Sequence, residues 1–179
     1  QGAWAFHQKL EPNNANTNED GTWPFDRFGE KLTMAGNFLA VSSYTYKEAN
    51  QVGAVYIYKL NTNNKNYELL TNGLLGPTKE TNFGSNLDLW YNGSNEYRLI
   101  VSQSGHNQIN LYRFADTLSD TDNITDKITL HFETNLSGLG HVNRKDMPVS
   151  IYENYFVVGD YGSSNSSTSG VSPQHSNVA

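Results

Sequence analysis

A two-residue motif returns along this chain at a nearly constant spacing, and this periodicity constrains the fold more than any other feature. The motif occurs as Phe28-Gly29, Phe83-Gly84 and Leu139-Gly140, so the two separations are almost equal. Short apolar segments typical of strands follow each pair. A constant period of about 55 residues predicts a repeat architecture, in which each copy folds as one unit that stacks on its neighbours.

The strand-forming segments come in the same order in each copy. No segment shows a helical period over 11 or more residues, so the expected elements are all strands. In the first copy we expect strands at 31–35, 38–42, 54–58 and 67–71, and in the second at 86–91, 97–102, 108–114 and 127–133. In the third copy we expect strands at 149–152 and 155–159, followed by a Ser/Gly-rich loop over 160–177, and residues 1–12 are expected to form one further strand.

The predicted fold is all-β, with about three four-stranded antiparallel blades of a β-propeller whose ring is incomplete. Propeller blades are four-stranded and repeat at about 40 to 50 residues. An immunoglobulin-like sandwich also has many short strands, but it does not copy itself at this period. The predicted boundaries are 1–12 for the outer strand of a preceding blade, 26–72 for the first blade, 81–133 for the second and 137–179 for an incomplete third.

The strand at 54–58 is apolar or aromatic on both faces, with Val55 and Ile57 on one and Tyr56 and Tyr58 on the other. A sheet covered on both sides loses polar alternation, so each blade is expected to lie between neighbours. Phe28 is expected to fill the space between adjacent blades. Three blades do not close a ring. We therefore expect the chain to be part of a longer one, or to pack against other blades, because its end faces are apolar.

Composition excludes several classes of function. The net charge is −6 and the 12 Lys and Arg residues are scattered, which argues against a nucleic-acid surface. The chain has no cysteine, and no apolar run approaches the roughly 20 residues of a membrane span. Asparagine gathers in runs such as 61–66, where it is typical of turns.

The order of residues in the first copy resembles the FG-GAP repeat of integrin-α-type β-propellers, and more closely its bacterial variant without calcium loops. The similarity lies in Phe28-Gly29, the Gly36-Asn37 turn, Leu39-Ala40-Val41 and Gly53-Ala54-Val55-Tyr56-Ile57-Tyr58, with Trp4, Lys9 and Leu10 fitting the strand that precedes the repeat. The second copy shares Phe83-Gly84, Leu99-Ile100-Val101 and Asn110-Leu111-Tyr112, and the third Val157-Val158-Gly159.

The resemblance implies an extracellular or cell-surface module for binding, adhesion or scaffolding, without catalytic activity. Its implied partners are a protein or glycan ligand and other propeller blades of the same or another chain. Integrin-like copies carry an acidic calcium loop between their first two strands. Here those places hold Gly36-Asn37 and residues 92–95, so calcium is not carried over and no cofactor is expected.

Five aromatic residues are candidates for ligand binding. They border the turns and loops next to the second strand of each copy, and comprise Tyr44, Tyr46, Trp90, Tyr91 and Tyr161. Aromatic faces beside Asn and Ser suit a sugar or a protein surface. The alternative is that these rings pack between blades.

The acidic residues offer two further hypotheses. The linker carboxylates Asp116, Asp120, Asp122 and Asp126 are weak candidates for Ca²⁺, since the loop lacks the central Gly and terminal Glu of calcium loops, and the alternative is a solvated loop. The second hypothesis is a propeller enzyme acting on glycans, a hydrolase or lyase. Its acid–base groups would come from Asp88, Glu96, Asp146 and Asp160, which nothing in the sequence pairs. No nucleophile elbow or phosphate loop is present.

Overall fold

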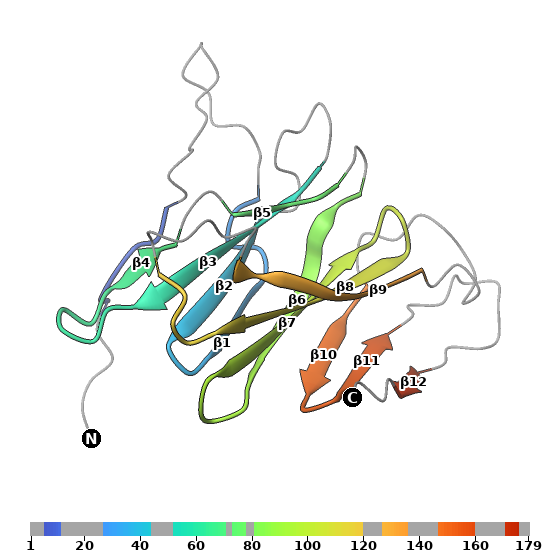
Figure 1. The fold of residues 1–179 in the computed structure, drawn as a ribbon. Coiled ribbons are helices and arrows are strands. Elements are labelled where there is room, and N and C mark those ends of the chain that lie inside the picture. The colour runs from blue at the N-terminus through green and yellow to red at the C-terminus, as the bar shows by residue number, and fades with distance from the viewer. Residues whose placement is uncertain are drawn as a thin grey trace, which may run out of the picture.

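The computed structural model describes residues 6–11, 27–43, 52–70, 73–77, 81–119, 127–135, 147–159 and 171–175. In these residues the regular elements are strands in three antiparallel sheets, with no helix among them. The sheets follow one another in chain order, each next to the one before it (Figure 1). The all-β prediction is therefore confirmed, and none of the sheets closes on itself.

The first sheet has the order β1 (Leu32–Ala35), β2 (Phe38–Ser43), β3 (Ala54–Leu60) and β4 (Tyr67–Leu69). A fifth strand, β5 (Leu74–Leu75), also pairs with β3. It was not predicted, because two residues next to glycine carry no alternating pattern.

The second sheet has the order β6 (Phe83–Tyr91), β7 (Glu96–Gln103), β8 (Gln108–Ala115) and β9 (Thr129–Asn135). Phe83 belongs to β6 rather than preceding it, because the pairing of β6 with β7 is interrupted between Phe83 and Leu87 and then resumes. A bulge of this kind lets one strand turn and still continue its ladder.

The third sheet consists of β10 (Val149–Tyr152), β11 (Tyr155–Gly159) and β12 (Val171–His175). The prediction of a loop throughout 160–177 was wrong for 171–175, because β12 pairs with the whole of β11, from Gly159↔Val171 to Tyr155↔His175. Its residues Ser, Pro, Gln and His show no apolar alternation. Pro173 fits such a strand, because β12 is at the edge of the sheet.

The two Phe-Gly pairs have the same backbone conformation. Gly29 and Gly84 have φ values of 88° and 85°, and the residues two positions earlier, Arg27 and Asn82, both have φ 49°. Left-handed backbone of this kind favours glycine, which explains why both pairs end in this residue. The repeat in the sequence is therefore accompanied by a repeat of the same backbone conformation.

A serine hydroxyl supports each of these turns. Ser42 Oγ accepts a hydrogen bond from Lys31 N at 3.1 Å, and Ser102 Oγ accepts one from Asn86 N at 2.8 Å. Lys31 and Asn86 are separated by the same interval as the two Phe-Gly pairs. In the third sheet the register puts Gly159 at the corresponding position, so this copy lacks the hydroxyl.

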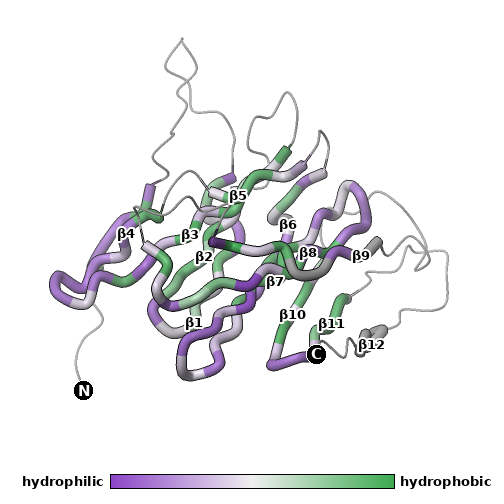
Figure 2. The backbone as a smooth tube through the Cα atoms, viewed as in Figure 1, coloured by the Kyte–Doolittle hydropathy of each residue, from purple (hydrophilic) through white to green (hydrophobic). Residues whose placement is uncertain are grey.

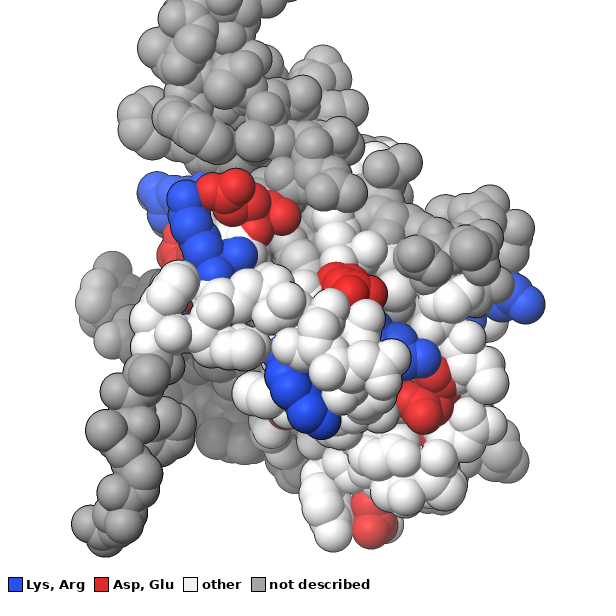
Figure 3. Space-filling view, turned by 90° about the vertical axis from the view of Figure 1, so that its left-hand side faces the viewer, with Lys and Arg blue, Asp and Glu red and all other residues white. Residues whose placement is uncertain are grey.

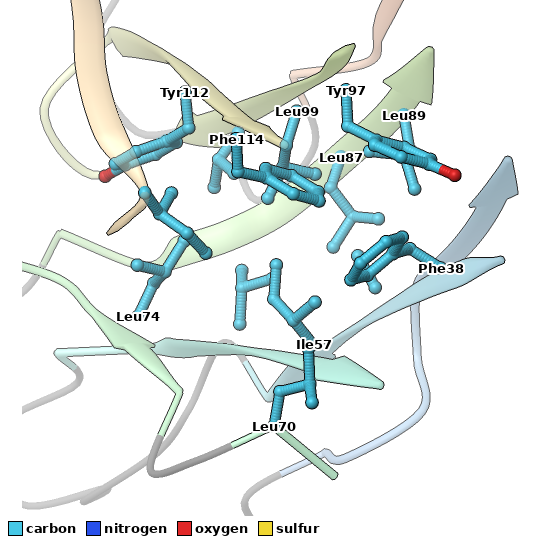
Figure 4. Packing of buried hydrophobic residues seen from close by; sticks show 14 of the residues in the cluster. Phe38, Ile57, Leu70, Leu74, Leu87, Leu89, Tyr97, Leu99, Tyr112 and Phe114 are labelled. Atoms are coloured by element: carbon cyan, nitrogen blue, oxygen red, sulfur yellow. The ribbon is translucent and has the colours of Figure 1, made fainter. Parts of the chain in front are cut away.

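The three sheets stack face to face, with the second in the middle. One buried cluster joins the first and second sheets, and in it the Phe38 ring lies 4.6 Å from Tyr97 and 5.1 Å from Phe114 (Figure 4). Another joins the second and third sheets, from Ile100 to Phe156. Apolar residues line these strands while the turns between them are polar (Figure 2). Both faces of the second sheet are therefore buried.

Phe28 and Phe83 occupy different surroundings. Phe83 is fully buried in the cluster between the first two sheets. Phe28 is half-buried and packs on the opposite face of the first sheet, with its ring 5.6 Å from Tyr56. No second sheet among the described residues lies against this face, so the place of Phe28 between two blades stays a prediction. Its repeat equivalent, Phe83, has that role.

Residues 6–11, the described part of the expected N-terminal strand, form no strand. The segment lies beside β4, where the Gln8 side chain donates to Tyr67 O at 2.9 Å and accepts from Tyr67 N at 2.8 Å. Tyr58 reaches the same segment and donates to Glu11 O at 3.1 Å. A side-chain amide thus replaces the backbone ladder that the sequence pattern predicted.

Candidate functional site

The first strands of the three sheets, β1, β6 and β10, meet at one carboxylate, and we call them the inner strands. Asp88 on β6 accepts hydrogen bonds from Thr33 Oγ1 on β1 at 3.1 Å and from its neighbour Leu89 N at 2.9 Å, both through Oδ1. Its Oδ2 accepts from Ser150 Oγ at 2.8 Å and from Ile151 N at 2.9 Å, both on β10. Asp88 therefore joins all three sheets.

Thr33, Asp88 and Ser150 occupy equivalent positions, and we call them the inner ladder. In each sheet this residue pairs with the same position of the second strand. The pairs are Thr33 with Ala40, Asp88 with Ile100 and Ser150 with Val157. The same bond is made at each step along the stack. Leu89 N donates to Thr33 Oγ1 at 3.2 Å, and Ile151 N donates to Asp88 Oδ2. An acceptor side chain of one sheet thus holds a backbone N–H of the following sheet.

The sequence analysis did not assign Thr33 or Ser150 to a site. The signal for Thr33 was present, because it follows Phe28 by five residues as Asp88 follows Phe83. Asp88 was considered as an acid–base residue. Three of its four hydrogen bonds join β6 to β1 or β10, which is a structural arrangement. Of the other acidic candidates, Glu96 binds Arg98 Nε at 2.5 Å, while Asp146 and Asp160 lie outside the described residues.

Two of the five candidate aromatic residues are described, and both contact other side chains. The Arg98 guanidinium lies 5.1 Å from the centre of the Trp90 ring, which packs against the cluster between the second and third sheets. Tyr91 stacks on Tyr97 at 4.4 Å. Ligand binding by these rings stays a prediction. Tyr44, Tyr46 and Tyr161 lie outside the described residues, as do Leu139 and Gly140 of the third repeat pair.

The acidic linker is described only at its start. Asp116 accepts a hydrogen bond from Tyr97 OH at 3.4 Å, and its carbonyl oxygen accepts one from Lys59. Asp120, Asp122 and Asp126 lie outside the described residues. In the part of the chain that the structure describes, no three His, Asp or Glu side chains come close enough together to hold a metal ion.

The turn at Asn92 shows what asparagine does in this chain. Its side-chain Oδ1 accepts hydrogen bonds from the backbone N–H groups of Ser94, Asn95 and Glu96, at 2.9 to 3.0 Å. The Asn61 and Asn64 side chains accept in the same way from Asn63 N and Asn66 N. Asparagine thus closes these turns, as its pattern predicted.

Three buried tyrosines have raised pKa values. Burial raises the pKa of Tyr97 to about 12, with Asp116 adding to the rise and the hydrogen bond from Asn37 N opposing it. Burial likewise raises the pKa of Tyr58 and of Tyr112. Because a tyrosine in an unfolded chain titrates near 10, the folded state holds these protons more tightly. The resulting stabilisation is complete below about pH 10 and is lost as the pH rises toward about 12.

We therefore expect the denaturant midpoint of the protein to fall as the pH rises above about 10. Tyr97→Phe should make this fall smaller, because the variant lacks one of the shifted phenols. Urea unfolding of both proteins at neutral and alkaline pH measures the difference. Tyr152→Phe is the matched control, since Tyr152 is 66% exposed. An equal effect of the two substitutions would contradict this assignment.

The two ends of the stack expose residues that are buried inside it. On β1, Leu32 and Met34 are 63% and 61% exposed, whereas their register equivalents on β6, Leu87 and Leu89, are 8% and 6% exposed. We call the surface formed by Leu32 and Met34 the leading face.

At the other end, Val157 is 41% exposed, whereas its equivalents Ala40 and Ile100 are fully buried. Tyr152 is also exposed, and its equivalent Trp90 is half-buried. We call the surface formed by Tyr152 and Val157 the trailing face. On the same side of the first sheet as the leading face, Leu39 and Val41 are buried in a cluster to which Leu10 and Phe28 contribute, so only the β1 edge of that side is exposed.

Charged groups do not form a patch of one sign on the face shown in Figure 3. Basic and acidic side chains are mixed there. Arg27 and Glu30 are an example of an exposed ion pair in this chain, at 3.5 Å. This agrees with the scattered charges of the sequence.

Comparison with protein-family models, curated proteins and solved structures found no significant match. Among the described residues there is no helix of the length and hydropathy that crossing a membrane requires.

Proposed function

We propose that this chain is a non-catalytic module for binding or scaffolding, built from β-propeller blades of the FG-GAP kind. The observation that carries the proposal is the exposure of Leu32, Met34 and Val157 at positions that are buried at the internal contacts. Exposed apolar surfaces that continue a packing pattern are typical of protein–protein contact sites. Each sheet corresponds to one blade, with β1, β6 and β10 nearest the axis.

The chemistry of the inner ladder supports a structural module over an enzyme. A general acid or base needs a geometry in which it reaches a substrate proton. Asp88 instead accepts from two strands besides its own, and the donors include Ile151 N and Leu89 N. Within this proposal Asp88 holds the blades in place.

The proposal assigns no metal ion to the turns. In a calcium loop, side-chain oxygens point at the cation. At the turn between β6 and β7, Asn92 Oδ1 accepts from backbone N–H groups, so it is already bound within the protein. The proposal places the chain outside the cell or at its surface, as the resemblance to FG-GAP repeats implies, with a protein or glycan as its ligand.

A hydrolysis and lyase assay on a panel of glycans tests the absence of catalysis. We expect no turnover above buffer from the unmodified chain, from Asp88→Asn or from Glu96→Gln. Circular dichroism identifies any variant that fails to fold. Turnover by the unmodified chain that a folded Asp88→Asn or Glu96→Gln variant has lost would overturn the proposal in favour of a glycan-acting enzyme.

A further inference from the structure

We propose that Arg113 binds the oxyanion group, a carboxylate or a sulfate, of an acidic glycan. The inference rests on the proposed function as a binding module, and it names the class of ligand. Arg113 lies on β8 next to Arg98 of β7, because the two residues are register partners. Arg98 is in turn the register partner of Trp90 on β6. One row across the second sheet therefore holds an aromatic ring and two guanidinium groups.

The guanidinium group of Arg98 is held by contacts within the protein. Its Nε donates to Glu96 Oε1 at 2.5 Å, and its Nη1 donates to Glu153 O at 2.6 Å and to Asn154 Oδ1. The same group lies 5.1 Å from the centre of the Trp90 ring, and the side chain is 11% exposed. Arg98 therefore joins the second sheet to the turn between β10 and β11.

Arg113 has no comparable set of contacts. Its buried Nε has no hydrogen-bond partner among the described residues. Glu96 Oε1 lies 3.6 Å from this Nε, and that oxygen already accepts from Arg98. The side chain of Arg113 is 28% exposed. A largely buried donor without an acceptor is costly, because it has lost water without gaining a hydrogen bond. An oxyanion from outside the protein supplies the missing acceptor.

The local charge favours an anion at this point of the sheet. Two guanidinium groups, of Arg98 and Arg113, face the single carboxylate of Glu96. This cluster therefore carries one net positive charge, in a chain whose net charge is −6. A guanidinium group presents its N–H groups in a planar fork that matches two oxygens of one oxyanion. A carboxylate and a sulfate share this chemistry.

Neutral polar groups beside the row favour a sugar as the rest of the ligand. Thr129, the register partner of Arg113 on β9, is exposed, and so is Asn154 in the turn of the third sheet. A hydroxyl and an amide suit the hydroxyl groups of a sugar, and Trp90 adds an aromatic ring to the same row. An acidic protein segment is matched by several cationic groups, whereas this row has a single arginine, Arg113, whose Nε lacks an acceptor among the described residues.

Titration of the isotope-labelled 179-residue chain with oligogalacturonate tests this inference by NMR. We expect the Nε–H signal of the Arg113 side chain to shift and to saturate, because this group lies at the binding site. Fully methyl-esterified oligogalacturonate is the matched probe. It has the same sugars without the carboxylates, so it should leave the signal unchanged. A sulfated galactan oligosaccharide shows whether sulfate replaces carboxylate, and a saturable shift with either acidic oligosaccharide supports the inference.

Variants identify the group that binds. Arg113→Gln should weaken binding at least about tenfold, because the ligand loses charge-assisted hydrogen bonds. Glu96→Gln should strengthen binding, because it removes the negative charge 3.6 Å from Arg113 Nε. A purely structural role of this cluster does not predict that gain. Arg27→Gln, at an exposed arginine before the first sheet, is the matched control and should bind like the unmodified chain.

Three results would overturn the inference: an Arg113 signal that neither acidic oligosaccharide shifts, equal binding of the methyl-esterified probe, or a folded Arg113→Gln variant that binds as well as the unmodified chain. Tighter binding of polyglutamate than of both oligosaccharides would also overturn it, in favour of an acidic protein segment. Circular dichroism identifies variants that are folded, and the titration of the unmodified chain decides if Arg113→Gln is not. Failure here leaves the proposed absence of catalysis unchanged, because the hydrolysis and lyase assay tests that separately.

Discussion

Phe83→Ala should lower the free energy of unfolding by about 3 to 5 kcal/mol, the usual cost of removing a fully buried phenylalanine ring. Phe83 lies between the first and second sheets, with its ring 6.3 Å from that of Tyr112. The neighbouring backbone is fixed by pairing and by the turn at Gly84, so the sheets cannot close around the cavity. Urea unfolding, followed by fluorescence and by circular dichroism, measures the loss.

Phe28→Ala provides the matched control, because the two residues are repeat equivalents with the same turn. Phe28 is half-buried at the end of the stack, so its replacement should cost clearly less than that of Phe83. Equal losses at the two positions would contradict the assignment of Phe83 as the residue that fills the contact between sheets.

Asp88→Ala should lower the free energy of unfolding by about 2 to 3 kcal/mol, because hydrogen bonds to a charged group are the stronger ones and their donors lose their acceptor. The donors include Thr33 Oγ1, Ser150 Oγ and Ile151 N. The effect should be local to the inner strands. Hydrogen exchange should therefore become faster at the amides of Leu89 and Ile151 than at those in the middle of β8.

Asp88→Asn and Glu30→Gln complete this experiment. Asn keeps the shape of Asp88 but turns an NH₂ group toward one pair of donors, so it should also destabilise the protein. Glu30 is exposed and pairs only with Arg27 in the described contacts, so its replacement should change little. Unchanged stability and exchange in Asp88→Ala would show that the carboxylate does not hold the sheets together.

The sequence predicted the strands where apolar alternation was sustained. The bounds expected for the first two strands of the third copy, 149–152 and 155–159, agree with β10 and β11. The strand expected at 97–102 is β7 within one residue at each end. These strands have one or both faces buried against a neighbouring sheet. Burial requires apolar residues at the buried positions, which produces the alternation seen in the sequence.

The sequence could not predict elements that depend on pairing alone. The strand β12 has Ser, Pro and Gln in its centre, and only its place beside β11 makes it a strand. Residues 6–11 are the opposite case, since Trp4 and Leu10 suggested a strand while the observed contact with Tyr67 uses the Gln8 side chain. Secondary structure of this kind is decided by tertiary contacts rather than by local propensity.

The candidate site was predictable only in part, for a related reason. The repeat placed Asp88 at the same point of its copy as Thr33, but no spacing shows that inner strands of different copies meet side by side. That meeting gives Asp88 its four donors. It also decides which face of each copy is inside the stack, and so why Phe28 and Phe83 differ.

The inner ladder also bears on how such copies can diverge. The donor at each step is a backbone N–H, at Leu89 and at Ile151, and every residue except proline supplies one. The acceptor is Thr33 at one step and Asp88 at the next, so a hydroxyl and a carboxylate serve equally. A copy can therefore lose nearly all identity with its neighbours and still be joined to them, provided that it keeps one short oxygen-bearing side chain and no proline after it.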